Sequence, residues 1–468
     1  MSHALSAEEL QIELTPNSAL LTWPGEELLF SSSTLQDFIL VEGAQSPFEQ
    51  TLSGTDRLFF QLRSLPEVLA PISDSTVGTE LIDIQGLVGG VLSDAEGLSV
   101  TVNGQNAQIE ANTAGESIFV LRDFTLALGA NSLTVIFSTS EGVQQTQNLT
   151  VTYDPVTANN VVIAGDYAYA AQGADGVAII HLETRSRTTL TVNNAVPQVD
   201  DLSFDGTFLF TLNAGSTNNA LSAYSLENPA NPTLVSGPVA ATSGFFSGVS
   251  AANGRVAVAG GTSALFVRTY DTETGAISNL FSSLDFVIGH PDVLLSEDGE
   301  LAHVSVDFPN GPNNFRFGIV TVALNAPPAS SVAGAEFGLT NLDGNFSLSA
   351  GGQDQTNFAV ESALVNDRLL VTSGNNLSIL NADGSSFQSS LPMGFFTVNV
   401  DGDGATAFVV GAQNGTPTLA EVDFTDPNNP SITSSTTFPG AGQFTGVAVN
   451  EDFVVIAAND GGLRVIAR

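Results

Sequence analysis

The chain has 468 residues, a formal net charge of −38, no cysteine and 11 basic residues besides histidine, all of them arginine. Such an acidic chain repels phosphate, which excludes nucleic acid as an expected partner and disfavours anionic membrane surfaces. Without cysteine or lysine it has no disulfides, thiol nucleophile or Schiff-base chemistry, but its 43% of hydrophobic residues can bury a large core.

The first ten residues lack the basic start and the apolar stretch of a signal peptide, and no run of about 18 apolar residues occurs. We therefore expect no membrane span. The lysine-free composition, rich in Ser, Thr, Asn and Gly, is typical of exported bacterial surface proteins. We expect a secreted or cell-surface protein whose chain is a mature form or a fragment, with a cytoplasmic protein as the alternative.

Short apolar stretches separated by Gly, Asn, Asp and Pro indicate an all-β chain. Breaks near Pro66–Pro71 and at Tyr153–Thr157 divide the chain into residues 1–69, 70–154 and 155–468. We expect two small β-sandwich-like modules, followed by a repeat array.

In residues 1–69, three motifs stand in the order Leu21–Pro24, Phe30–Ser33 and Thr55–Arg63. They resemble a small fibronectin type III-like module. Trp23, the only tryptophan, is expected in the core of that module, and stacking on a ligand is the alternative.

In residues 70–154, apolar and polar residues alternate more densely. Val102–Gly104 predicts a hairpin turn with positive φ at Asn103 and Gly104, and Leu128–Asn131 predicts a second tight turn. The order of these strands and turns resembles bacterial immunoglobulin-like modules of the glucodextranase B type. The resemblance implies a spacer or docking unit without a catalytic role.

Residues 155–468 repeat a β-turn followed by an apolar strand, roughly every 45 residues. The turns are Ala164–Asp166, Phe204–Gly206, Ala252–Gly254, Glu297–Gly299, Asn366–Asp367, Asp401–Gly404 and Asn450–Asp452. Four short strands in each repeat are typical of a propeller blade. The sequence therefore predicts a seven-bladed β-propeller.

Two places depart from this regular spacing. Residues 325–358 make one interval longer than the rest, which predicts an insertion in the fourth blade, with an eighth degenerate blade as the alternative. The chain stops after the third strand of the last blade. Its fourth strand is expected from residues 148–160; otherwise the last blade has three strands.

A Pro/Asn turn follows the third strand in two blades, at Ser225–Pro232 and Asp423–Pro430. These turns resemble the LVIVD-type repeats of bacterial extracellular propellers. The resemblance implies a surface or secreted interaction protein and carries no catalytic residue.

One loop suggests calcium. Asn399, Asp401 and Asp403, followed by Gly404, place oxygen ligands at alternate positions before a glycine, as in the start of a calcium loop. The closing acidic residue of such a loop is missing. An Asp-Gly hairpin turn without metal is the alternative, so we expect either no cofactor or calcium.

A second candidate site lies in the loops that lead into each inner strand and rim one end of the central channel. These loops carry Phe245, Phe246, His290, Asp292, Phe358, Glu361, Phe395, Phe396 and Phe444, with Asp200 and Asp201 beside them. The residues predict a ligand-binding rim of aromatic and acidic side chains. The alternative is that the phenylalanines pack between adjacent blades.

No nucleophile elbow and no phosphate-binding loop occur in the chain. We therefore expect a non-catalytic recognition or adhesion protein that binds a protein or a surface glycan through its propeller loops. The alternatives are a calcium-dependent propeller hydrolase or lactonase, and a structural subunit of an extracellular assembly.

Overall fold

We describe the protein from a computed structural model. The structure describes residues 11–14, 18–22, 28–32, 39–40, 46–51, 59–63, 66–89, 98–111, 117–139, 144–192, 198–213, 220–240, 246–260, 264–285, 292–309, 314–324, 338–341, 346–347, 361–384 and 386–468. These residues form strands and turns and no helix, so the predicted all-β class is confirmed there. No helix in the described residues is long and apolar enough to cross a membrane.

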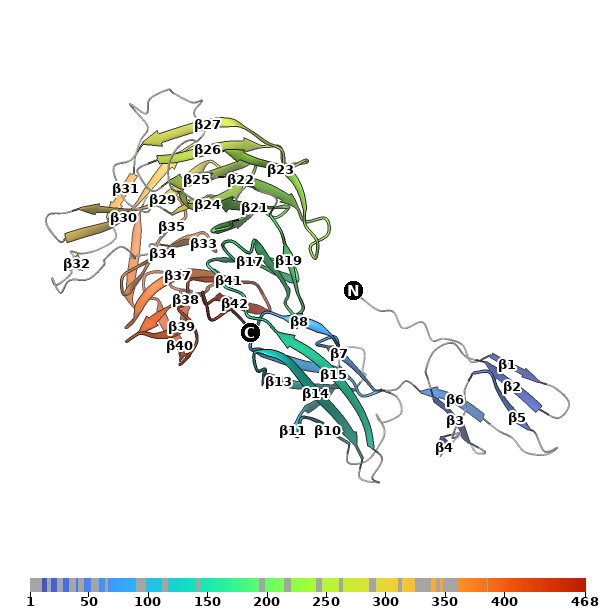
Figure 1. Ribbon diagram of the computed structural model, residues 1–468. Helices are drawn as coiled ribbons and strands as arrows, with labels where there is room; N and C mark the ends of the chain where they lie inside the picture. The colour runs from blue at the N-terminus through green and yellow to red at the C-terminus, as the bar shows by residue number, and fades with distance from the viewer. Residues whose placement is uncertain are drawn as a thin grey trace. The chain divides into compact units, whose positions relative to one another are not determined.

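By its contacts the chain groups into two compact units (Figure 1). One unit comprises residues 1–75, 82–125 and 130–151, and the other comprises 76–81, 126–129 and 152–468. The predicted division at residues 69/70 and 154/155 stays a prediction.

The first unit begins with two three-stranded antiparallel sheets, in the orders β1-β2-β5 and β4-β3-β6. Their strands are β1 (Gln11–Leu14), β2 (Ser18–Thr22), β3 (Leu28–Ser32), β4 (Ile39–Leu40), β5 (Phe48–Thr51) and β6 (Phe59–Arg63). Trp23 lies outside the described residues, so its predicted place in a core stays a prediction.

Two larger sheets follow, in the orders β12-β13-β9-β7 and β11-β10-β14-β15-β8. Their strands are β7 (Glu67–Ala70), β8 (Ser75–Val77), β9 (Leu81–Leu87), β10 (Ser99–Val102), β11 (Gln105–Asn106), β12 (Gln108–Ala111), β13 (Ser117–Thr125), β14 (Gly129–Ser138) and β15 (Gln144–Tyr153). In β9 every second residue is buried, and Phe119 meets Phe137 edge-on with ring centroids 5.3 Å apart. The predicted hairpin turn is confirmed, because Asn103 and Gly104 have φ of 46° and 82°.

The second unit contains seven consecutive antiparallel sheets in its described residues. The first sheet contains β16 (Val161–Ala164), β17 (Tyr167–Ala171), β18 (Val177–His181) and β19 (Arg187–Leu190). The second contains β20 (Asp201–Phe204), β21 (Phe208–Asn213), β22 (Ala220–Ser225) and β23 (Thr233–Ala240). The third contains β24 (Phe246–Ala252), β25 (Arg255–Gly260), β26 (Ala264–Tyr270) and β27 (Ile277–Asp285). In each, the strands pair in chain order.

The remaining four sheets continue the pattern. The fourth sheet contains β28 (Val293–Leu295), β29 (Leu301–Pro309), β30 (Asn314–Ala323) and β31 (Gly338–Asn341), and β32 (Phe346–Ser347) also pairs with β30. The fifth contains β33 (Ser362–Val365), β34 (Arg368–Ser373), β35 (Asn376–Asn381) and β36 (Phe387–Pro392), and the sixth contains β37 (Phe396–Asp403), β38 (Thr406–Gln413), β39 (Thr416–Asp423) and β40 (Ser431–Thr437). The seventh contains β41 (Gly446–Val449), β42 (Phe453–Ala457) and β43 (Leu463–Ala467).

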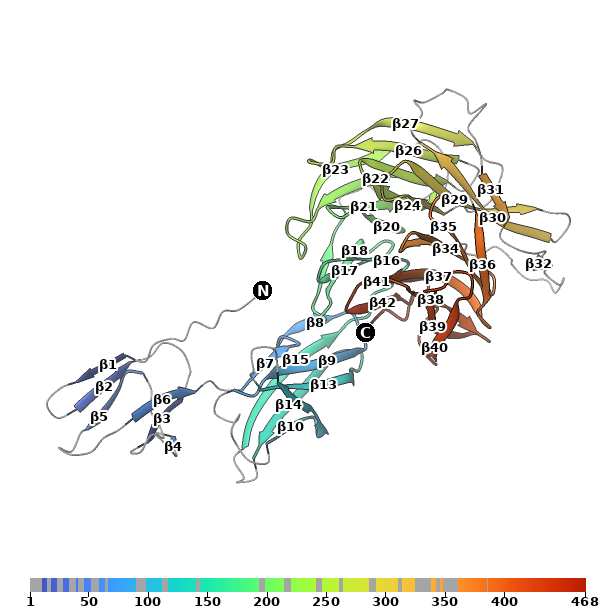
Figure 2. The ribbon, with the colours of Figure 1, turned by 180° about the vertical axis from the view of Figure 1, so that it is seen from behind.

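The first strands of the seven sheets neighbour one another in chain order, and the last of them, β41, neighbours the first, β16. The sheets therefore form a closed, propeller-like ring (Figures 1 and 2). Clusters of buried hydrophobic side chains lie between most pairs of adjacent sheets, and one cluster joins Ala168 and Ile180 of the first sheet to Val455 of the last. Burial of this cluster ties the two ends of the ring together.

The described residues cover the two irregular places in part, and the choice between an insertion and an eighth blade stays open. β31 and β32 both pair with β30, so residues 338–341 supply the fourth strand of that sheet. The last sheet has three strands, as the second alternative predicted. Residues 148–160 do not supply a fourth strand, because β15 belongs to another sheet and Ala158 forms only an isolated bridge to Asn459.

Candidate ligand-binding channel

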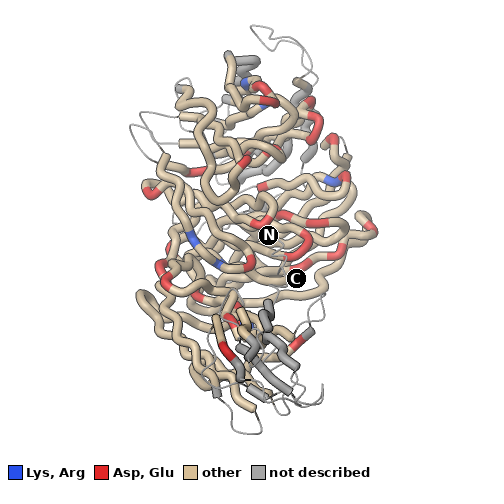
Figure 3. Tube along the Cα trace, turned by 90° about the vertical axis from the view of Figure 1, so that its right-hand side faces the viewer, with Lys and Arg blue, Asp and Glu red and all other residues tan. Residues whose placement is uncertain are grey.

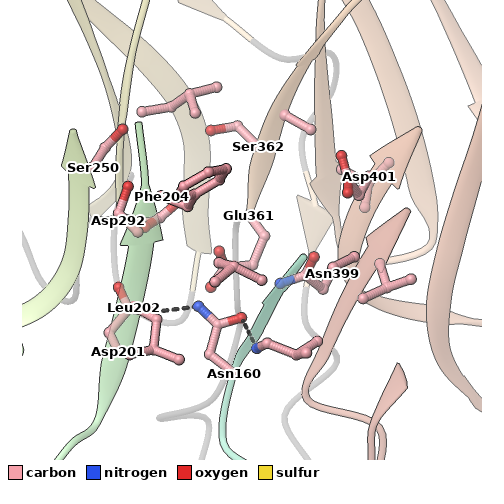
Figure 4. A pocket seen from close by; sticks show the side chains of 18 of the residues that line it. Asn160, Asp201, Leu202, Phe204, Ser250, Asp292, Glu361, Ser362, Asn399 and Asp401 are labelled. Atoms are coloured by element: carbon pink, nitrogen blue, oxygen red, sulfur yellow. Dashed lines mark hydrogen bonds between the residues drawn. The ribbon is translucent and has the colours of Figure 1, made fainter. Parts of the chain in front are cut away.

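A cavity of about 320 Å³ lies between the first strands of all seven sheets. Its polar lining is Asn160, Asp201, Ser203, Ser250, Asp292, Glu361, Ser362, Asn399 and Asp401, and Figure 4 shows most of these side chains around the space. The four carboxyl groups meet no Arg or His in the lining. The cavity is therefore an acidic chamber at the centre of the ring.

The position of these polar groups follows from the sheet topology. Each first strand pairs with a second strand on one side only, so half of its backbone N–H groups have no partner within their own sheet. Backbone N–H groups that are buried without a partner cost free energy. A polar side chain from the preceding sheet can satisfy them.

Four such hydrogen bonds join neighbouring sheets. Asp201 Oδ2 accepts from the Val249 N–H at 2.7 Å, and Asp401 Oδ2 accepts from the Val449 N–H at 2.8 Å. Two serine hydroxyls do the same: the Ala251 N–H donates to Ser203 at 2.9 Å, and the Leu295 N–H donates to Ser250 at 2.9 Å. The partners are 45 or 48 residues apart in sequence, one repeat each.

Asn160 continues this pattern where the ring closes. Its side-chain Nδ2 donates to Asp201 Oδ1, and its Oδ1 accepts from the Val161 N–H at 2.7 Å. In two sheets, a glycine of the first strand stands where other sheets carry a polar residue that faces the channel. A Cβ atom at Gly446 would lie 2.9 Å from Asn160 Oδ1, and one at Gly248 would overlap Asp292 Oδ1. A larger residue there would displace the neighbouring polar side chain, because that side chain occupies the space.

Loss of hydration dominates the electrostatics of the channel wall. Burial raises the pKa of Asp201 to about 6, although hydrogen bonds from Asn160 and Val249 lower it. Burial likewise raises the pKa of Asp401 to about 6, against hydrogen bonds from Gly402 and Val449. A carboxylate surrounded by protein loses more hydration than two or three hydrogen bonds restore.

Asp292 and Glu361 form a coupled pair. Burial raises the pKa of both groups. The nearby carboxylate of Asp201 raises the pKa of Asp292 further, and the carboxylates of Asp292 and Asp201 raise the pKa of Glu361 further. A hydrogen bond joins the two side chains, with Glu361 as the protonated donor and Asp292 as the acceptor. Above about pH 7, the raised pKa of Asp292, the pair therefore carries one proton and one negative charge.

Asn399 shares one feature with Ser362, whose buried Oγ also has no hydrogen-bond partner among the described residues. Asn399 is only 8% exposed, and Figure 4 shows its amide directed into the cavity toward Glu361 and Asn160. Within the described residues its side chain has no hydrogen-bond partner, although an amide has two donors and an acceptor.

The structure divides the predicted rim residues. Asp292 and Glu361 come together at the cavity. Phe395 is 4% exposed in the core between the fifth and sixth sheets, and Phe444 is 3% exposed in the core between the sixth and seventh. These two side chains pack between sheets, as the alternative predicted.

Phe396 begins β37. Phe245, His290 and Phe358 lie outside the described residues, as does the side chain of Phe246, so their predicted roles stay predictions.

The predicted calcium ligands are also divided. Asn399 and Asp401 line the cavity, whereas Asp403 pairs with Arg468 at 2.7 Å. In the described part of the chain, no three His, Asp or Glu side chains gather as a metal site requires. Of the three predicted ligands, Asn399 and Asp401 thus remain at the cavity, and the calcium site stays a prediction.

The lining includes serine hydroxyls but no His, Lys or Tyr to activate them. Two histidines of the described residues lie elsewhere: His181 in β18, and His303 fully buried in β29 with its Nδ1 3.0 Å from Thr321 Oγ1. Nucleophilic catalysis needs a base within hydrogen-bond reach of the nucleophile. The carboxyl groups and amides of the cavity can accept hydrogen bonds from a ligand, and the amides can also donate them.

The sequence pointed to Asp201, Asp292 and Glu361 but not to Asn160, Ser203 or Ser250. The signal was present as a polar residue in or just before each first strand, at the repeat spacing. It was easy to overlook because the side chains differ in type from repeat to repeat.

No protein-family model matches the chain, and no curated protein matches it in sequence. Among solved structures, a computationally designed protein, Ika8, is similar with a TM-score of 0.46 and 11% identity over 72% of this chain and 93% of that one. A chain of the mitotic checkpoint complex gives a TM-score of 0.48 at 12% identity, covering 67% of this chain and 90% of that one. Saccharomyces cerevisiae Sqt1 gives 0.44 at 8%, covering 67% and 96%. Likeness this distant carries no conclusion about function.

Proposed function

We propose that residues 155–468 form a seven-bladed β-propeller and that the protein is a non-catalytic recognition protein, which binds a protein partner at the end of the channel where the first strands begin. The observation that carries the proposal is the acidic cavity between seven first strands, lined by carboxyl groups, amides and serine hydroxyls. Such a chamber can receive a cationic or hydrogen-bonding group of a partner.

The negative net charge of the chain indicates what surface charge the partner should have. Figure 3 shows acidic positions spread over the strands and turns, with few basic ones between them. A protein with a basic surface is attracted to such a molecule and associates faster at low salt. We infer a secreted or cell-surface protein, from its lysine-free composition rich in Ser, Thr, Asn and Gly. The modules before residue 155 then act as a spacer.

A photo-crosslinking experiment tests this function. A crosslinking amino acid replaces Gln198, which lies two residues before Asp200 in the segment leading into β20, and in a control it replaces Ser434 on the exposed outer strand β40. We expect one dominant crosslinked protein from the first position only. The purified partner should then bind the intact chain in calorimetry, with an affinity that falls as salt rises. Equal crosslinking from both positions, or no binding by the purified partner, would contradict the proposal.

A calcium-dependent hydrolase is the second candidate, and one observation favours it: Asn399 and Asp401 present side-chain oxygens to the same cavity. Calcium prefers carboxylate and amide oxygens. This candidate predicts that calcium raises the thermal midpoint and that a chelator lowers it.

A further inference from the structure

The cavity has more negative charge than its surroundings neutralise. Asp201, Asp401 and the coupled pair contribute about three negative charges above about pH 7, and no basic residue is among the lining residues. A cation that entered would be attracted by all of these groups at once, in surroundings where charges interact more strongly than in water.

Asn399 supplies an independent sign of a ligand. A side chain that is 8% exposed and unpartnered among the described residues loses hydration without replacing its hydrogen bonds. Its amide is directed into the cavity, beside Glu361 (Figure 4). A ligand with N–H donors would bond the amide oxygen and a carboxylate together.

The geometry favours an ammonium group over a guanidinium group. A guanidinium pairs best with both oxygens of one carboxylate. Both oxygens of Asp201 already accept hydrogen bonds, from Asn160 and Val249, and Asp401 already accepts from Val449. What remains are single acceptor positions on separate strands, which suit the three diverging N–H donors of an ammonium group.

A metal ion fits this arrangement less well. Calcium takes six to eight oxygen ligands that converge on one point. The described carboxyl groups do not converge in a group of three, and two of them are held by backbone N–H groups. The cavity volume of about 320 Å³ exceeds what a bare ion fills, but it accommodates an ammonium group together with part of an alkyl arm and water.

We propose that this cavity binds a primary ammonium group carried on a flexible alkyl arm, namely a lysine side chain of the protein partner, at Asn399 and the neighbouring Glu361, while the other carboxyl groups of the wall contribute negative charge. The inference rests on the proposed function, since it names the group by which the partner is recognised. A free alkylamine offers the same chemistry, and the experiment separates the two sources.

The probe is n-butylammonium chloride, which reproduces the end of a lysine side chain, titrated into the full chain by calorimetry at pH 7.5. We expect a dissociation constant of about 1 mM or lower. Tetramethylammonium has the same charge without N–H donors and should bind at least tenfold more weakly, as should n-butylguanidinium. Calcium chloride is the third comparison. Equal binding of tetramethylammonium, or tighter binding of calcium, would overturn the proposal.

The variants test the site itself. Asn399→Ala should weaken n-butylammonium binding at least tenfold, and Asn399→Gln should restore part of it. Asp426→Asn, a carboxylate removed from the exposed turn before β40, is the matched control and should leave the affinity unchanged. Thermal melts confirm that each variant is folded. An Asn399→Ala protein that melts like the wild type and binds n-butylammonium equally well would contradict the proposal.

Lowering the pH supplies a further readout. Four titratable groups face the cavity: Asp201 from β20, Asp292 before β28, Glu361 before β33 and Asp401 from β37. The other first strands, β16, β24 and β41, and the residues just before them contribute only Asn160, Ser250 and apolar groups. Protonation at pH 5 should weaken butylammonium binding at least tenfold, and an affinity independent of pH would count against the site.

Acetylation of the partner separates this inference from the proposed function. If acetylation of its lysines abolishes binding of the crosslinked partner, and n-butylammonium displaces the unmodified partner at constant ionic strength, its lysine occupies the cavity. If the acetylated partner binds as before while n-butylammonium still binds the cavity, the lysine assignment is overturned and a free amine is the ligand. If no partner is found but n-butylammonium binds with the predicted selectivity, the proposed function fails and the ammonium site stands.

Discussion

The acidic residues of the channel wall and those of the outer turns both accept hydrogen bonds, but the first are buried and the second are exposed to water. Asp201 accepts hydrogen bonds from Asn160 and from a backbone N–H of the next sheet. Asp423, on an exposed turn, accepts from the backbone N–H and the hydroxyl of Thr425, at 2.8 and 2.7 Å. The pKa of Asp201 is raised because burial dominates. The pKa of Asp423 is lowered because its hydrogen bonds dominate.

The difference teaches that the acidic residues of the described chain include two populations with opposite electrostatics. The turn carboxylates stabilise local backbone at little cost, because water still hydrates their other lone pairs. The channel carboxylates hold neighbouring sheets together and are costly to ionise. Only the second population forms a site at which a ligand can replace lost hydration.

The largest expected effect comes from removing a channel carboxylate. Asp201→Leu leaves the Asn160 amide and the Val249 N–H without their acceptor, and we expect a loss of about 3 kcal/mol in the free energy of unfolding. Asp201→Asn keeps the shape and one acceptor, so we expect a loss of about 1–2 kcal/mol. Urea unfolding measures both. Two variants as stable as the wild type would show that Asp201 does not join the sheets.

The pH dependence of stability should separate the two populations. The folded pKa of Asp201 is raised, so the folded state binds a proton more tightly than the unfolded state does. This contribution is present below the unfolded pKa near 3.8 and is lost as pH rises through about 6. The shift corresponds to roughly 2–3 kcal/mol between pH 4 and pH 8.

The lowered pKa of Asp423 has the opposite sign: its contribution is present above the unfolded pKa and is lost as pH falls through the folded value. Urea midpoints at pH 5 and pH 8, in high salt to suppress general repulsion, measure the balance. We expect the wild type to be more stable at pH 5, and Asp201→Asn to reduce that difference. The same difference in both proteins would assign the effect elsewhere.

A turn variant provides the smaller matched effect. Asp423→Ala removes the acceptor for Thr425 at a site open to water, so we expect a smaller loss of urea midpoint than in Asp201→Leu, because water replaces the lost hydrogen bonds. Asp423→Asn retains an acceptor and should lie between the alanine variant and the wild type. A turn variant that destabilises as much as the channel variant would erase the distinction between the two regions.

The smallest expected effect is that of calcium. Since the described carboxyl groups do not converge on one point, we expect the thermal midpoint to stay within about 1 °C on adding EDTA or calcium, well below the shift that a tightly bound ligand produces. A clear rise with calcium and a fall with EDTA would instead favour a metal at Asn399 and Asp401.

Much of the fold could be predicted, because its signals are local. The Asn-Gly turn at Asn103 and six of the seven repeat turns, all except Asn450–Asp452, follow from residue types that tolerate positive φ. The alternation along β9 and β14 follows from the two-residue period of a strand. These signals need no knowledge of distant residues.

The site was only partly predictable, because it depends on how strands from different repeats meet. Asp401 and Asp403 are two residues apart, and both were expected at one metal. Two residues span about 7 Å of strand, which carries Asp403 past the cavity to Arg468. Phe395 and Phe444 were expected at the rim with Asp292, but the sheet-to-sheet packing directs both into cores.

The sequence by itself determined that this protein is all-β, that its second part is a repeat, and where its turns and acidic residues lie along the repeat. These properties are set by backbone preferences and by apolar periodicity within a few residues. Only the tertiary structure decided which carboxyl groups lose hydration, which share a proton and which pair with arginine. Those properties depend on closure of the ring, which brings residues one repeat apart to within hydrogen-bond distance and leaves Asn399 facing the cavity.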